Sequence, residues 1–186
     1  MLALSEAIKT GVVPNAEIVL IASDKPGAKG LQAAQELGYE TIVVERKGKI
    51  REEHETEIVG ALKSRKVDLV CLAGYMRLLS PCFTDAFPHR ILNIHPSLLP
   101  SFPGLDAQQQ AITHGVRFSG CTVHFVDDTL DGGPIIAQRV VPVLDDDSAE
   151  TLSARILEQE HLLYPEALAL VVSGEFEIAG RRVVRK

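Results

Sequence analysis

The hydrophobic residues of this chain alternate between two patterns. Short runs rich in β-branched residues predict strands, and longer segments with apolar residues three or four positions apart predict helices. The run VDLVCLA at 67–73 has no polar alternation, which is typical of a strand buried on both faces. Strands and helices follow one another through the first two-thirds of the chain, which predicts an α/β fold with a mainly parallel sheet, helices on both faces and antiparallel strands near the C-terminus.

The predicted elements have clear boundary residues. Pro26 and Gly38 bracket one helix, and Ser80 and Pro81 form the cap and first turn of a short one. Pro165 lies inside the last helix, where it predicts a kink. A small hairpin around position 180 ends the chain. The predicted helices are 2–11, 26–38, 51–65, 80–87, 105–114 and 148–172, and the predicted strands are 16–23, 40–45, 67–73, 90–94, 119–127 and 134–143.

The predicted elements begin with a helix, where a βαβ fold would begin with a strand. The first predicted element is a helix ended by Gly11, yet a right-handed βαβ unit needs a strand before its helix as well as after it. We therefore expect the first strand to be missing from this chain, together with the loop after it, which commonly holds a phosphate. On this interpretation residues 1–186 form one N-terminally truncated domain with a gap in its sheet.

Composition narrows the class of function. The chain has 19 basic and 25 acidic residues and a net charge of −6, which argues against a nucleic-acid surface and favours small-molecule chemistry. Cys71, Cys82 and Cys121 are widely spaced, which argues against a disulfide framework and against a structural zinc site. The apolar runs are too short to cross a membrane and no signal peptide is evident, so we expect a cytoplasmic protein.

Polar side chains interrupt the strand that ends in LNIHP. Asn93 and His95 are two positions apart, so they project from the same face of the strand, close to its carboxyl end. In open α/β sheets ligands bind at that end. Pro96, Pro100 and Pro103 then fix the backbone of the following loop. Taken alone, a histidine beside such a loop is more often a structural, hydrogen-bonded group.

A carboxylate in the later turn VDDTLDGG favours a functional interpretation of His95 over a structural one. Asp131 can be aimed at His95, where its charge would favour the imidazolium form. An amide, an imidazole and a carboxylate make a plausible set for acyl transfer, with Asn93 stabilising charge on a carbonyl oxygen and His95 moving protons. For Asp127 and Asp128 a solvated turn is the simpler interpretation. We interpret His124 as a core or near-core histidine.

Five separate blocks together carry a family resemblance. They closely resemble the phosphoribosylglycinamide formyltransferases, folate-dependent enzymes of purine synthesis, over the chain from about residue 2 to the final hairpin. The resemblance implies a Rossmann-like formyltransferase sheet and direct transfer of a formyl group from 10-formyltetrahydrofolate to phosphoribosylglycinamide, without a covalent enzyme intermediate. It implies no metal, and it allows a homodimer. The blocks are LAGYMRLLS at 72–80, NIHPSLLPSFPG at 93–104, GCTVHFV at 120–126, LDGGPII at 130–136 and EQEHLLYPEAL at 158–168.

The resemblance also assigns roles to residues. Asn93, His95 and Asp131 match the catalytic residues, with His95 as proton donor. For Arg51, which matches a residue at the folate tail, a solvated helix start is an equally good explanation. The other folate-binding matches are Met76, Arg77, Leu78, Leu79, Asn93, Asp127, Asp128, Thr129, Leu130 and Asp131, and the ribotide-binding matches are Leu157, Glu158, Gln159 and Glu160.

Three other functions share parts of this pattern. A formyltetrahydrofolate hydrolase would pass the formyl group to water, but this chain has no room for the regulatory domain that such enzymes carry. Methionyl-tRNA formyltransferases have an additional tRNA-binding domain and a different loop after the histidine. A folate-binding protein with little turnover would follow if the phosphate loop is absent.

Overall fold

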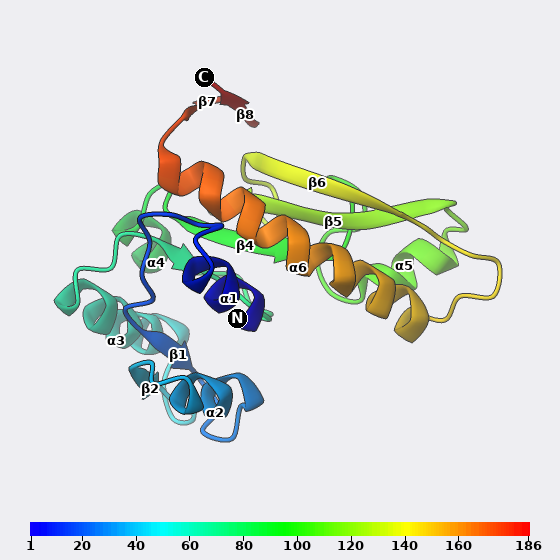
Figure 1. The fold of residues 1–186 in the computed structure, drawn as a ribbon. Coiled ribbons are helices and arrows are strands. Elements are labelled where there is room, and N and C mark those ends of the chain that lie inside the picture. Colours follow the sequence, from blue (N-terminus) through cyan, green and yellow to red (C-terminus); the bar gives the residue numbers. More distant parts are fainter.

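Helices and strands alternate along the chain as the hydrophobic pattern predicts (Figure 1). The structure is a computed structural model that describes residues 1–186. Helix α6 continues through Pro165, and the C-terminal hairpin is present. The elements are α1 (Leu2–Lys9), β1 (Ile21–Ser23), α2 (Lys29–Glu36), β2 (Thr41–Val43), α3 (Arg51–Ser64), β3 (Val70–Cys71), α4 (Pro81–Ala86), β4 (Ile91–His95), α5 (Ala107–Thr113), β5 (Phe118–Phe125), β6 (Ile135–Pro142), α6 (Ala149–Ser173), β7 (Phe176–Ala179) and β8 (Arg182–Arg185).

The strands form two hydrogen-bonded groups. Strands β1 and β2 pair in parallel, and the other six form a sheet in the order β3-β4-β5-β6-β8-β7. Within that sheet β3 and β4 are parallel, β5 is antiparallel to both β4 and β6, and β8 is parallel to β6 and antiparallel to β7. The α/β class is therefore confirmed, but the sheet is mixed: antiparallel pairing already begins between β4 and β5, because β5 returns beside β4.

Strands β1 and β3 are shorter than the sequence predicts. Strand β1 begins at Ile21, and β3 contains only Val70 and Cys71. Each has a hydrogen-bonded neighbour on one side only. Whether a further strand belongs to this fold stays a prediction.

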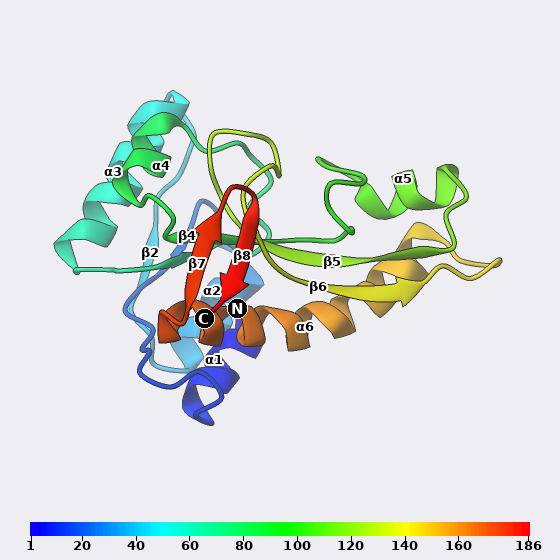
Figure 2. The ribbon, with the colours of Figure 1, turned by 90° about the horizontal axis from the view of Figure 1, so that it is seen from above.

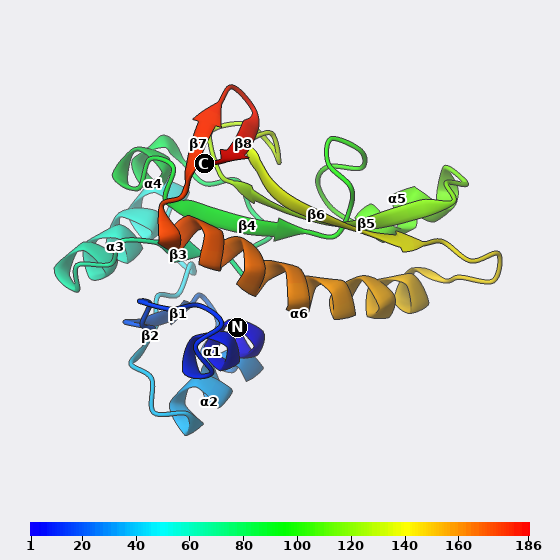
Figure 3. The same ribbon diagram turned by 45° about the horizontal axis from the view of Figure 1, so that its top comes forward.

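Two apolar clusters lie on opposite faces of β4. Leu92 belongs to the larger cluster, with residues of α1, β5 and α6, whereas Ile91 belongs to a smaller cluster with residues of α3 and α4. Figure 2 shows α1 and α6 on one side of the strands and α3 and α4 on the other, and Figure 3 shows α6 lying across β4, β5 and β6. Because side chains alternate along a strand, the face of β4 that carries Ile91 also carries Asn93 and His95.

None of the helices is both long enough and apolar enough to cross a membrane.

Candidate functional site

Strand β4 places the two polar residues of its carboxyl end against β5. In the antiparallel register Asn93 lies opposite His124, and His95 lies opposite Thr122. His95 is buried, with 5% of its surface exposed, and Asn93 is half-buried. The predicted pair therefore lies on one face of the sheet, at the edge where the chain leaves β4 for the proline-rich loop.

Thr122 anchors this loop, residues 96–104, to β5. Its hydroxyl donates to the carbonyl oxygen of Ser97 (2.7 Å) and accepts from the backbone N–H of Leu99 (3.0 Å). The loop in turn gives His95 a partner, because the carbonyl oxygen of Phe102 accepts a hydrogen bond from Nε2 (2.9 Å). Since a carbonyl oxygen only accepts, Nε2 carries a proton in the neutral as well as the charged form of His95.

Asp131 closes the site from the loop between β5 and β6. Its Oδ2 accepts a hydrogen bond from the backbone N–H of Gly104 (2.8 Å) and lies 3.5 Å from Nδ1 of His95. Its Oδ1 lies 3.8 Å from Nε2 of His124. The side chain is only 13% exposed, so its charge is weakly screened by water. The structure thus brings Asn93, His95 and Asp131 together, as the sequence predicts.

The backbone at Asp131 is unusual, and its neighbours require glycine. Asp131 has φ +48°, the left-handed region that an L residue other than Asn or Asp rarely adopts. A Cβ at Gly133 would lie 2.0 Å from the carbonyl oxygen of Phe125, and one at Gly132 would lie 2.1 Å from Oγ1 of Thr129. The turn therefore needs two glycines to bring Asp131 back to the strand ends.

His124 is part of this site, which the sequence reasoning missed. It is 2% exposed, so the expectation of a buried histidine is correct, but its ring contacts the catalytic candidates. Burial lowers the pKa of His124 from its ordinary value of 6.5, which keeps the ring neutral. Nδ1 donates to the carbonyl oxygen of Phe125 (2.8 Å), so Nε2 accepts from the amide Nδ2 of Asn93 (3.3 Å). His124 therefore fixes the orientation of the Asn93 amide.

The two buried cysteines offer no thiolate for covalent catalysis. Burial raises the pKa of Cys121 to about 12 and that of Cys71 to about 11, so both thiols keep their protons at neutral pH. Cys82 is exposed on α4, where its sulfur contacts the hydroxyl of Thr56. No group of three or more His, Cys, Asp or Glu side chains is arranged to hold a metal ion.

The segment predicted to contact folate divides into exposed and buried parts. Met76 is 72% exposed and Leu78 48% exposed, and Arg77 is exposed as well. Leu79 instead belongs to the smaller apolar cluster, where its side chain anchors the segment. At the start of α3, Arg51 lies 3.2 Å from the carboxylate of Glu52.

Glu55 holds the far end of this segment. It is fully buried, and its Oε2 accepts hydrogen bonds from the backbone N–H (2.8 Å) and the hydroxyl of Ser80. The hydroxyl of Tyr75 lies 3.5 Å from its other oxygen. Ser80 is the N-cap residue of α4, but its side chain makes no cap hydrogen bond because it points to Glu55. The predicted start of this helix, with Ser80 as the cap residue and Pro81 in the first turn, is confirmed, although the serine side chain binds Glu55.

The loop after β5 uses its first aspartate to form a local turn. Oδ1 of Asp127 accepts from the backbone N–H of Thr129 (2.9 Å) and from its hydroxyl (2.5 Å). Asp128 and Leu130 are exposed. The solvated-turn interpretation therefore fits Asp128, whereas Asp127 shapes the loop that carries Asp131.

The predicted ribotide residues lie on the other face of the sheet. Leu157 and Glu158 are exposed on α6, whereas Gln159 and Glu160 are half-buried. Burial raises the pKa of Glu160, and its charge in turn raises the pKa of Cys121, a residue of the larger apolar cluster. No hydrogen bond of the protein joins this group to the catalytic candidates.

Comparisons with known proteins identify the family. The profile of the formyl transferase family matches residues 2–168. The phosphoribosylglycinamide formyltransferase of Escherichia coli is 38% identical over 177 residues, which are 95% of this chain and 83% of that protein. This chain belongs to the phosphoribosylglycinamide formyltransferase family.

The solved structure of a glycinamide ribonucleotide transformylase from Symbiobacterium toebii is similar to this chain over almost its whole length. The two share 46% sequence identity and a TM-score of 0.96, and the match covers 98% of this chain and 86% of the other. The trifunctional purine biosynthetic protein adenosine-3 of Drosophila melanogaster is 48% identical over 161 residues. That match covers 86% of this chain but only 12% of the trifunctional protein, so the formyltransferase corresponds to a small part of it.

Proposed function

We propose that this formyltransferase transfers the formyl group of 10-formyltetrahydrofolate to the amine of 5'-phosphoribosylglycinamide, a step of de novo purine biosynthesis. The observation that carries the proposal is the network of an amide, an imidazole and a carboxylate at the end of β4, with contacts of 3.3 to 3.8 Å among Asn93, His95, His124 and Asp131. When an amine attacks a formyl carbon, negative charge develops on the formyl oxygen. The site therefore needs a hydrogen-bond donor for that oxygen and a group that moves protons.

Asn93 supplies the donor. One hydrogen of its amide nitrogen is directed to neutral His124, which holds the side chain in a single orientation. The second hydrogen of the same nitrogen remains for the formyl oxygen. Because this donor is in place before the reaction, little reorganisation is needed as charge builds.

His95 and Asp131 handle the protons. The protonated ring donates from both nitrogens, to Phe102 through Nε2 and toward Asp131 through Nδ1. The 3.5 Å between Nδ1 and Oδ2 is longer than a strong hydrogen bond, so the Nδ1 proton is the one that can be passed, directly or through a water held by Asp131, to the departing folate nitrogen. The attacking amine nitrogen becomes positively charged as its bond to the formyl carbon forms, and the proton that it then loses restores the protonated form of His95. Asp131 stays in place meanwhile because Gly104 donates to it.

The formyl group passes directly from the folate to the amine, without a covalent formyl-enzyme intermediate. A covalent formyl-enzyme would need an activated nucleophile, and the two buried thiols have raised pKa values. Attack by the amine itself needs only the three groups at the end of β4.

The two substrates approach from different sides of the sheet. Exposed Met76 and Leu78, in the segment before α4, offer apolar surface for the folate ring. Glu160, on α6, is a plausible acceptor for the ribose hydroxyls. Glu160 lies on α6, which packs against the face of β5 that carries Cys121, and Cys121 precedes Thr122, the residue opposite His95. The amine would then reach the formyl group past the end of β4.

Turnover of 10-formyltetrahydrofolate, measured with and without phosphoribosylglycinamide, tests the proposal. We expect tetrahydrofolate to form only when the ribotide is present, together with formylated ribotide. Release of free formate at the same rate with and without ribotide would instead identify a hydrolase. Folate binding without any turnover would identify a binding protein.

A further inference from the structure

Gln138 belongs to a row of polar side chains that crosses strands β4, β5 and β6. Thr122 of β5 lies opposite His95 of β4 on one side and opposite Gln138 of β6 on the other. Because directly paired residues of a sheet point to the same face, Gln138 lies on the face that carries His95. No hydrogen bond joins Gln138 to a catalytic candidate, so any effect that it has on the chemistry must pass through other residues.

The amide nitrogen of Gln138 ties the proline-rich loop to the sheet. Nε2 donates one hydrogen to the carbonyl oxygen of Leu99 and the other to Oγ1 of Thr122, both at 2.9 Å. The carbonyl oxygen of Leu99 can only accept, so the part of the amide that faces it must be the nitrogen. Figures 2 and 3 show the loop, residues 96–104, on the side of β5 and β6 away from α6. The side chain of Gln138 is therefore a hydrogen-bonded link between β6 and this loop.

With Gln138 in place, the hydroxyl of Thr122 has a complete set of partners. Its hydrogen goes to the carbonyl oxygen of Ser97, and its oxygen accepts from the N–H of Leu99 and from Gln138. A hydroxyl has one donor and two acceptor positions, so none is left free to let it rotate. Both backbone polar groups of Leu99 are thus bound to the sheet, the N–H by Thr122 and the carbonyl by Gln138.

Leu99 in turn fixes the part of the loop that holds His95. The backbone N–H of Ser101 donates to the carbonyl oxygen of Leu98 (3.0 Å), which closes a turn around Leu99. Directly after this turn comes Phe102, whose carbonyl oxygen accepts the hydrogen bond from Nε2 of His95 (2.9 Å). A shift of the turn would therefore move the acceptor of Nε2, and the ring of His95 with it.

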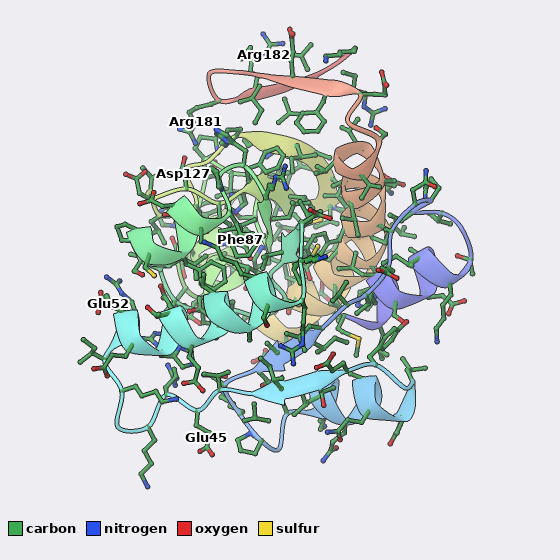
Figure 4. The ribbon with its side chains drawn as sticks, turned by 90° about the vertical axis from the view of Figure 1, so that its left-hand side faces the viewer. Glu45, Glu52, Phe87, Asp127, Arg181 and Arg182 are labelled. Carbon is green, nitrogen blue, oxygen red and sulfur yellow. The ribbon has the colours of Figure 1, made fainter.

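Strand β6 gives this link a firm support. It pairs with β5 along its length, and at its start the N–H of Ile135 donates to the carbonyl oxygen of Arg181 in the C-terminal hairpin (3.2 Å). In Figure 4, Arg181 and Arg182 lie at the same end of the molecule as Asp127, in the loop that carries Asp131. The hairpin holds β6 from one side and β5 holds it from the other, so the glutamine acts from a fixed position.

We propose that Gln138 is a positioning residue for His95, which acts through Thr122 and the loop 96–104 and not through contact with a substrate. This inference rests on the proposed function, because it takes His95 as the group that moves protons in the transfer. The side chain of Gln138 is exposed, so replacing it should change the stability of the fold little while it releases Leu99. The rate should fall nonetheless, because catalysis is sensitive to small displacements of a catalytic group.

The kinetic experiment compares kcat and KM of Gln138→Glu and Gln138→Met with those of the control Gln109→Met. Glutamate keeps the shape of glutamine but places an oxygen against the carbonyl oxygen of Leu99, and methionine removes the donor altogether. We expect both variants to lower kcat about 10-fold or more, with little change in the KM for either substrate. Gln109→Met removes a glutamine hydrogen bond of 3.2 Å within α5 and should keep the full kcat. Gln138→Lys, which offers a donor again, should recover part of the lost rate.

A spectroscopic measurement reports the position of His95 without any substrate. Its Nε2–H donates to Phe102, so the NMR signal of this proton in protein with isotope-labelled histidine responds to that hydrogen bond. In Gln138→Glu we expect the signal to move upfield and to exchange faster with water, because the hydrogen bond lengthens. The Nε2–H signal of His54, which bonds to the carbonyl oxygen of Val44 (2.7 Å), is the internal control and should stay unchanged.

The outcomes separate this inference from the proposed function. A kcat for Gln138→Glu equal to that of the control, or a lowered kcat with an unchanged signal from His95, would overturn the positioning role. A raised KM with an unchanged kcat would make Gln138 a substrate contact and also overturn it. If the unaltered chain shows no ribotide-dependent turnover, the proposed function fails, and the signal of His95 in the variants still tests its link to Gln138.

Discussion

Replacing Asp131 by asparagine would remove a charge from the site while keeping its shape. Asparagine tolerates the left-handed backbone seen at this position, with φ +48°, and its side-chain oxygen can still accept the hydrogen bond from Gly104. The variant should therefore fold with nearly unchanged stability. What it loses is the negative charge 3.5 Å from Nδ1 of His95.

The size of that loss follows from the geometry. Two unit charges 3.5 Å apart attract by about 5 kcal/mol at an effective dielectric constant of about 20, the value suited to partly buried groups. The polar amide of the variant and nearby water replace part of this attraction. We expect about 2.7 to 4 kcal/mol to be lost from stabilisation of the protonated ring in the transition state, which lowers kcat about 10²- to 10³-fold.

The assay is the rate of tetrahydrofolate formation at saturating ribotide, with thermal unfolding as the check on folding. Asp128→Asn is the matched control, because it removes the same charge from an exposed position of the same loop. We expect that control to retain its kcat. A kcat for Asp131→Asn within a few-fold of the unaltered enzyme would refute the role given to this carboxylate.

Three further predictions concern the stability of the fold. Gly133→Ala places a methyl group 2.0 Å from a backbone oxygen, so we expect the free energy of unfolding to fall by about 1–3 kcal/mol in urea denaturation. Glu55→Ala leaves two buried donors of its partner serine without an acceptor, which should cost about 1–3 kcal/mol in the same measurement. Because the fold lowers the pKa of His124 below 6.5, the unfolded chain binds a proton below that pH that the folded chain does not. Stability should therefore fall as pH drops from 7 to 5, with a slope of up to about 1.4 kcal/mol per pH unit from this residue, and His124→Gln should flatten the profile.

Each of these predictions has its own control. Gly27→Ala adds the same methyl group where no atom lies within 4 Å, so equal losses for the two glycine variants would contradict the packing argument. Glu55→Gln keeps an oxygen acceptor and should lose less stability than Glu55→Ala. A pH profile of the His124→Gln variant that matches the unaltered protein would show that another group governs acid sensitivity.

The local pattern of apolar and polar residues was enough to predict β4, the strand that carries Asn93 and His95. The alternation in ILNIH placed Asn93 and His95 on one face, and the structure has them there because Leu92 and Ile94 face the larger apolar cluster. The start of α6 was equally readable, since Ser148 accepts a hydrogen bond from the N–H of Thr151 in the first turn. Both features depend on residues a few positions apart.

Features that depend on distant residues could not be predicted. His124 meets Asn93 only because β5 pairs with β4 in one particular antiparallel register, across 31 positions of the chain. Glu55 and Ser80 are 25 positions apart, so the serine was interpreted as a helix cap. Leu79 looked like a folate contact within its motif, but its burial depends on the packing of α3 and α4.

Because the strands form two hydrogen-bonded groups, we expect the region of β1 and β2 to differ in local stability from the six-stranded sheet. Strands β1 and β2 pair only with each other, so no ladder of backbone hydrogen bonds ties them to β3. Their region is attached through side-chain contacts such as that of Leu20 with the smaller apolar cluster. In native-state hydrogen exchange, amides of β1 and β2 should open at a lower free energy than those of β4, β5 and β6. The loops that follow β1 and β2, with Lys25 and Lys47, therefore lie in the region expected to open first, and the catalytic candidates at the end of β4 lie in the region expected to open last.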